Sequence, residues 1–166
     1  RLSRLGLEYL DLYLLHWPYQ MKPGATLPPK DKADVLGFSV DSFVAMWRQM
    51  EGFVESGKVR AIGVSNLPLR KLVAVWPHMR IKAAVNQVEA HPFLASEPLL
   101  AWCRKHGVVV TAYSPLGSPS RPARMVEATD PAPLHDATVA AIAAKHGVSP
   151  AQVLLRWGVQ RGTVVI

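Results

Sequence analysis

The chain has 166 residues, of which 49% are apolar and 19% charged, and its formal net charge is +7. This composition is typical of one globular domain and excludes a largely disordered protein. The longest apolar run, Val139–Ala144, is too short to cross a membrane, and no secretory signal stands in the first fifteen residues. The single cysteine, Cys103, excludes a disulfide framework and favours a reducing, cytoplasmic location.

The charge has two interpretations. The nineteen Lys and Arg residues are scattered along the chain, whereas a nucleic-acid-binding arm would cluster them. We therefore favour a solvated basic surface and expect no nucleic-acid partner. Nucleic-acid binding is the alternative, and it predicts binding with a steep salt dependence.

Strand and helix patterns alternate along the chain. Hydrophobic patterning predicts strands at 7–15, 59–64, 83–89 and 108–113, and a fifth strand from Thr163 onward. Predicted helices are one capped by Asp41 and ending near Gly57, one opened by Pro68 and running to Trp76, one capped by Ser96 and ending at Gly107, one at about 136–146, and one at 150–160 opened by Ser149 and Pro150. Proline and glycine predict long loops at 18–40 and about 115–133.

Strands separated by helices indicate a parallel sheet built from crossover units. A doubly wound sheet and part of a (β/α)8 barrel both fit this order. No G-x-G-x-x-G loop follows any strand, which disfavours the doubly wound fold. A barrel needs eight strands and about 250 residues. We predict an α/β fold in which residues 1–166 form a partial (β/α)8 TIM barrel domain of about five parallel strands.

Both ends of the sequence suggest a longer protein. The first residue is Arg1, and the first methionine is Met21. The last residues, Thr163–Ile166, form a β-branched apolar run of the kind found in buried strands, where a domain rarely stops. We expect a domain truncated at both ends.

Polar groups stand at the carboxyl ends of four consecutive predicted strands. They are His16 and Trp17, then Ser65 and Asn66, then Gln87 with Glu89, then Tyr113 and Ser114. The carboxyl ends of parallel strands lie at one rim, where barrel enzymes place their sites. Together these residues predict a binding site.

Each of these residues also has a simpler interpretation. A Ser-Asn pair before a helix is a common cap, and Gln87 is compatible with a satisfied interior amide. Tyr113 is compatible with core packing and His16 with a structural role. No histidine spacing indicates a metal site, no G-x-S-x-G elbow supports a hydrolase triad, and Cys103 falls on the apolar stripe of a helix.

Four stretches resemble the aldo-keto reductase superfamily, most closely its aldose and aldehyde reductase branch. They are residues 10–18 (LDLYLLHWP), 57–66 (GKVRAIGVSN), 86–89 (NQVE) and 111–118 (TAYSPLGS), in the order of that family. The resemblance covers essentially the whole chain. It implies a (β/α)8 barrel that reduces aldehyde or ketone carbonyls with NADPH and without a metal.

The resemblance also implies a role for individual positions. His16 matches the histidine that orients the carbonyl oxygen, and Trp17 matches a residue lining the substrate pocket. Other matches contact the cofactor: Ser65, Asn66 and Gln87 the nicotinamide carboxamide, Tyr113 the nicotinamide face, and Ser114, Leu116 and Ser118 the pyrophosphate. These roles agree with the residue types, because a flat aromatic face and fixed amide partners select one orientation of the ring.

The sequence departs from the family at several positions. The catalytic aspartate, tyrosine and lysine of the family precede the segment present here, and its adenosine 2′-phosphate segment follows Ile166. Leu67, Ser120 and the pair Leu27-Pro28 differ from residues common in the branch. The sequence therefore predicts an oxidoreductase fragment that is inactive alone. The alternative is a truncated chain with at most a weak nucleotide site or a noncatalytic partner role. Nothing in the sequence fixes the oligomeric state.

Overall fold

The computed structural model describes residues 2–26, 29, 31–118, 130 and 132–166. Ser120, Leu27 and Pro28 lie outside the described residues, as does much of the predicted loop at 115–133. Among the described residues, no helix is long and apolar enough to span a bilayer.

The helices and strands alternate along most of the chain. Their bounds are α1 (Leu2–Leu5), β1 (Leu10–Leu15), β2 (Gln20–Met21), β3 (Val35–Gly37), α2 (Val40–Glu55), β4 (Val59–Ser65), α3 (Leu69–Val75), β5 (Val85–Glu89), α4 (Glu97–Lys105), β6 (Val109–Tyr113), α5 (Ala137–His146), α6 (Pro150–Gln160) and β7 (Val164–Val165). Short 3-10 turns span Lys32–Asp34, Trp76–His78 and Pro133–His135.

Five strands form one sheet in the order β1-β4-β5-β6-β7, and the pairs β1–β4 and β6–β7 are parallel. The strand order follows the chain without a reversal, whereas a doubly wound sheet reverses at its switch point. The predicted α/β class is confirmed, and the sheet is consistent with a partial (β/α)8 barrel.

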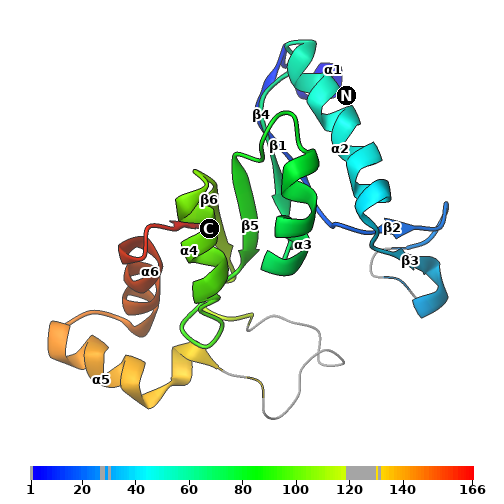
Figure 1. The fold of residues 1–166 in the computed structure, drawn as a ribbon. Coiled ribbons are helices and arrows are strands. Elements are labelled where there is room, and N and C mark those ends of the chain that lie inside the picture. Colours follow the sequence, from blue (N-terminus) through cyan, green and yellow to red (C-terminus); the bar gives the residue numbers. More distant parts are fainter. Residues whose placement is uncertain (1, 27–28, 30, 119–129, 131) are drawn as a thin grey trace. The chain divides into compact units, whose positions relative to one another are not determined.

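The chain divides into two compact units, and the first comprises residues 1–86 and 105–108. In it, β1 pairs with β4 and α2 packs against β4 (Figure 1). Phe43 and Trp47 of α2 are buried, and the ring of Phe53 meets Tyr13 edge-on. Helix α2 therefore buries its apolar stripe on this part of the sheet.

A buried carboxylate fastens α2 to the segment that leads into β5. Glu51 is fully buried and accepts hydrogen bonds from Arg48 Nη1 (2.6 Å) and Arg80 Nε (3.0 Å). It also accepts from the backbone N–H groups of Arg80 (2.7 Å) and Ile81 (3.0 Å). Burial by itself raises the pKa of Glu51, but the hydrogen bonds from Arg48, Ile81 and Arg80 outweigh it and lower the pKa from 4.5 to about 2.

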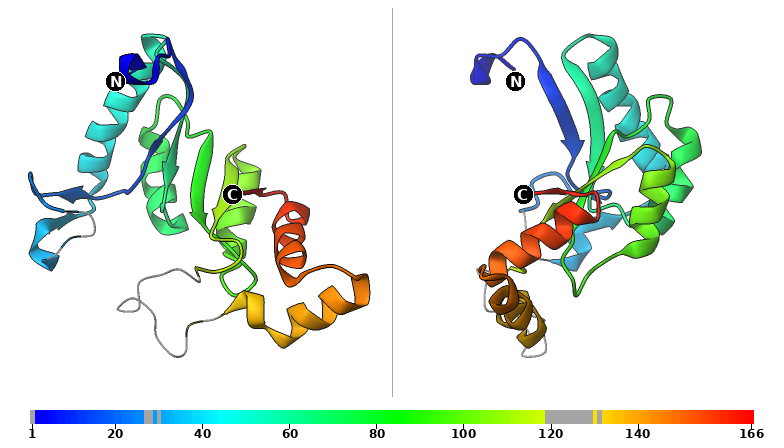
Figure 2. Two further views of the ribbon diagram at one scale, coloured as in Figure 1. Left: turned by 180° about the vertical axis from the view of Figure 1, so that it is seen from behind. Right: turned by 90° about the vertical axis from the view of Figure 1, so that its left-hand side faces the viewer.

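The second unit comprises residues 87–104 and 109–166. In it, β6 pairs with β7, and helices α5 and α6 contact each other (Figure 2). The predicted start of α6 is confirmed. Ser149 is the N-cap, Pro150 is the first residue of the helix, and Ser149 and Gln152 form a capping box. Cys103 is fully buried, as predicted, and burial raises the pKa of its thiol to about 11.

Several predicted boundaries are wrong. Ser39, not Asp41, caps α2, because the backbone of Ser39 is extended and its hydroxyl accepts from the Ser42 N–H. Strands β1 and β5 begin later than predicted, β7 holds only two residues, and α1 was not predicted. The predicted loop at 18–40 contains the antiparallel pair β2–β3, which joins segments with no strand pattern in the sequence.

Candidate functional site

Three of the predicted site residues meet in the first unit. Strand β4 ends at the buried Ser65, and Asn66 follows it with a φ of 55°. The Asn66 Nδ2 donates to the backbone oxygen of His16 (3.0 Å) and to Ser65 Oγ (3.2 Å). The carboxyl end of β4 is thus tied to the segment that follows β1.

The side chains that follow β1 form an aromatic cluster. The rings of His16 and Trp17 are stacked at 5.9 Å with an interplanar angle of 23°, and Tyr19 lies 5.5 Å from Trp17. His16 and Trp17 are both exposed. An imidazole held against an aromatic face and open to solvent is available to bind a small polar group.

The other predicted residues belong to the second unit. Gln87 is half-buried on β5, and Tyr113 is half-buried at the end of β6. The Ala90 N–H donates to the backbone oxygen of Tyr113 (3.3 Å), and this bond joins the ends of these two strands. Glu89, also on β5, places Oε1 3.5 Å from Nε2 of His91, a residue that is only 5% exposed.

A short turn follows β6. Ser114 has a φ of 51°, its oxygen accepts from the Gly117 N–H (2.9 Å), and its hydroxyl accepts from Ser118 Oγ (3.1 Å). Leu116 is half-buried between them. The turn therefore brings the hydroxyl groups of Ser114 and Ser118 together.

Backbone strain is the feature of these strand ends that sequence reasoning missed. Asn66 and Ser114 each come directly after a strand and each adopt the left-handed conformation, which costs a non-glycine residue about 1 kcal/mol or more. Such strain persists where surrounding contacts impose it, and it concentrates at functional sites. The tolerance of asparagine for this conformation was the available signal at position 66.

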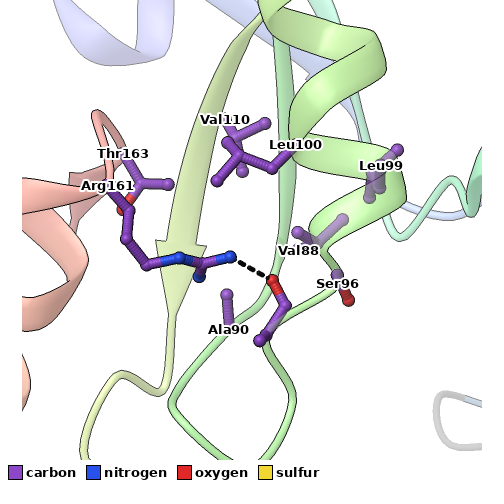
Figure 3. Close-up of a pocket in the computed structure, with 9 residues that line it drawn as sticks. Val88, Ala90, Ser96, Leu99, Leu100, Val110, Arg161 and Thr163 are labelled. Carbon is purple, nitrogen blue, oxygen red and sulfur yellow. Dashed lines mark hydrogen bonds between the residues drawn. The ribbon is translucent and has the colours of Figure 1, made fainter.

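Two hollows of the second unit lie apart from the predicted residues. The smaller hollow has a volume of about 10 Å³. Figure 3 shows its lining side chains, among which Arg161 donates to the backbone oxygen of Ala95 (2.6 Å). This hollow has room for at most one water molecule, so it is too small for a substrate. A larger hollow of about 610 Å³ lies on α5 and α6, lined by Ile142, His146, Val148, Gln152, Val153, Arg156, Trp157 and Gln160. Within the described part of the chain, no three metal-ligating side chains gather.

A parallel α/β sheet whose strand order follows the chain is consistent with part of a (β/α)8 barrel. Comparison with known proteins narrows the class. A sequence model described as the Aldo/keto reductase family matches residues 1–166. The chain belongs to the aldo/keto reductase family.

Individual relatives agree with this assignment. The Aldo/keto reductase slr0942 of Synechocystis sp. is 46% identical over 165 residues, which cover 99% of this chain and 50% of that protein. Aldo-keto reductase family 1 member A1 of Xenopus tropicalis and that of Gallus gallus are each 44% identical over the same shares. The chain thus spans about half the length of the relatives it matches.

Proposed function

We propose that this chain is part of an NADPH-dependent reductase that converts aldehyde or ketone carbonyls to alcohols. The observation that carries the proposal is the pair of strained residues, Asn66 and Ser114, at positions that match cofactor-contacting residues of the family. Family membership and the reductase names of the relatives support it.

The residues present fit a nicotinamide. A primary carboxamide offers both hydrogen-bond donors and acceptors and needs both in return. Ser65 and Asn66 of the first unit and Gln87 of the second carry side chains that donate and accept. The half-buried ring of Tyr113 offers a flat apolar face of the kind on which another ring stacks.

Each residue has a distinct role in the proposed reaction. NADPH, when bound, supplies the hydride. By the resemblance, Ser65, Asn66 and Gln87 would contact the nicotinamide carboxamide and Tyr113 the face of the ring, and such contacts would fix the orientation of the ring. His16 donates a hydrogen bond to the carbonyl oxygen, and Trp17 lines the substrate pocket. The bond from Asn66 to the His16 oxygen holds the segment that bears this imidazole.

Proton donation is the step that residues 1–166 do not cover under this proposal. The resemblance assigns it to a tyrosine supported by an aspartate and a lysine, none of which has a match here. A carbonyl that is oriented but not protonated forfeits a factor on the order of 10² or more. We therefore expect binding without appreciable turnover from this chain alone.

The test is nucleotide binding, followed through quenching of tryptophan fluorescence. We expect saturable binding of NADPH, and we expect Tyr113→Ala to weaken it about tenfold, because one stacked aromatic face is lost. The matched control is Tyr9→Ala: Tyr9 precedes β1, where its ring packs on Arg60, and this variant should bind like the wild type. Equal affinities for Tyr113→Ala and wild type would contradict the proposed role.

Binding and turnover measured together distinguish the reductase from the alternative, a noncatalytic nucleotide-binding chain. Turnover of an aldehyde by any longer form of the protein that contains residues 1–166 favours the reductase. Binding of NADPH with no turnover in every such form favours the noncatalytic role. Parallel titrations with NADH test the choice of cofactor.

A further inference from the structure

Asn86 is bonded to the loop that carries Asn66, and it is not one of the predicted site residues. Asn86, the second residue of β5, is fully buried. Its Nδ2 donates to the backbone oxygen of Leu67 at 2.8 Å, across nineteen positions of sequence. This bond joins β5 to the residue directly after Asn66.

The geometry explains why such an anchor is needed. A non-glycine residue at a φ of 55° relaxes toward a negative φ unless its neighbours hold it. On the N-terminal side, Ser65 is fixed in the β4 ladder, and on the C-terminal side the Leu67 side chain is fully buried. The Asn86 amide fixes the carbonyl of Leu67, so the turn is held on both sides of Asn66.

The oxygen atom of the Asn86 side chain, Oδ1, shows which part of the amide matters. Within the described part of the chain, Asn86 Oδ1 receives no hydrogen bond although it is buried. A buried amide that lacks one of its partners is costly, so a role in packing alone is poorly served by asparagine. We therefore infer that the Asn86 side chain serves chiefly to donate its Nδ2 hydrogen bond to the Leu67 oxygen.

We propose that Asn86 is a positioning residue that keeps Asn66 in the left-handed conformation, in which the Asn66 amide reaches the oxygen of His16. The bond from Asn86 to Leu67 imposes the conformation, and the conformation directs the Asn66 side chain. The consequence for nicotinamide binding rests on the proposed function, whereas the positioning itself is a property of the protein without a ligand.

The decisive variant is Asn86→Asp in the full 166-residue chain. It preserves shape. Because burial raises the pKa of a carboxyl group, the variant is measured at a pH high enough to ionise the new side chain, which then presents an acceptor to the backbone oxygen of Leu67 in place of the donor. We expect the ¹³Cα and ¹³Cβ shifts of Asn66 to leave left-handed values and its side-chain N–H exchange to accelerate at least about tenfold. On acidification that protonates the new carboxyl group, its O–H donates to Leu67 and both signals should return.

Two internal references separate this effect from loss of the fold. The Trp47 indole N–H donates to the Ile81 oxygen (3.0 Å) in the same unit, and its exchange should not change. Gln49→Glu, an amide-to-carboxylate change at an exposed site on α2, should leave Asn66 unaffected. Wild-type Asn66 shifts in Asn86→Asp at a pH that ionises the new carboxyl group, with the Trp47 signal intact, would overturn the proposal.

A second test uses the wild-type chain, so it does not depend on whether a variant folds. A scalar coupling across the hydrogen bond, between Asn86 Nδ2 and the Leu67 carbonyl carbon, should be detectable. Its absence, or a negative φ at Asn66 in solution, would overturn the proposal. Because no nucleotide is added, failure of NADPH binding leaves this result unaffected and counts only against the proposed function.

Discussion

We expect Glu51→Gln to lower the free energy of unfolding by about 3 kcal/mol at neutral pH. The wild-type carboxylate is fully buried and accepts four hydrogen bonds, two from arginines and two from backbone N–H groups. Glutamine has one oxygen for these donors and points N–H groups at the others. A shift of the pKa from 4.5 to about 2 corresponds to a stabilisation of similar size, about 3 kcal/mol.

The effect has a defined dependence on pH. Because the folded-state pKa of Glu51 is lowered, its contribution is fully present above about pH 5 and is lost as the pH falls through 4.5 toward 2. Urea unfolding followed by circular dichroism should therefore show a gap between wild type and Glu51→Gln that is constant near neutrality and shrinks in acid.

Glu55→Gln is the matched control. Glu55 lies on the same helix and also pairs with Arg80, at 3.4 Å, but its side chain is 57% exposed. Exposed pairs contribute less than about 1 kcal/mol. If the two variants lose the same stability, the buried carboxylate does not hold α2 to the segment before β5.

Gly63→Ala should have the second large effect, a loss of about 2 to 3 kcal/mol or failure to fold. A Cβ at Gly63 would lie 2.6 Å from Leu14 Cδ2, 2.7 Å from the Val85 oxygen and 3.2 Å from Val85 Cβ. Val85 cannot move away freely, because the residue before it is fixed to β4 by the bond from the Ala84 N–H to the Ile62 oxygen, at 2.8 Å. Added volume in such a packed site forces strain.

Gly52→Ala provides the comparison on α2. Nothing lies within 4 Å of a Cβ at Gly52, and glycine is unfavourable within a helix. This substitution should raise the melting temperature slightly, while Gly63→Ala lowers it by many degrees. Thermal melts of the two variants test whether close contact of backbones, rather than glycine flexibility, selects Gly63.

Local signals account for the parts of the fold that the sequence predicted well. Ser149, Pro150 and Gln152 lie within four consecutive residues and specify the start of α6 by themselves. The start of α2 was harder to predict, because Ser39 and Asp41 are both good caps. The path of the incoming chain determines which of the two residues caps the helix. The β2–β3 pair depends on contacts between distant segments, which no local pattern records.

The site shows the same division. The types of His16, Asn66 and Tyr113 and their places after strands were visible in the sequence. The positive φ of Asn66 and Ser114 was not, because it arises from the turns that follow the strands. The burial of Glu51 and Asn86 was also hidden, because a glutamate within a helical pattern and an asparagine within a strand pattern usually face solvent.

Under the proposed function, the left-handed conformation of Ser114 places stability and binding in opposition. Glycine at position 114 would relieve a backbone cost of about 1 kcal/mol and would remove the side chain that the turn displays. Under the proposed function, a laboratory selection for thermal resistance alone should therefore enrich glycine at position 114 and weaken ligand recognition. A selection that also demands binding should retain Ser114 and gain its stability elsewhere.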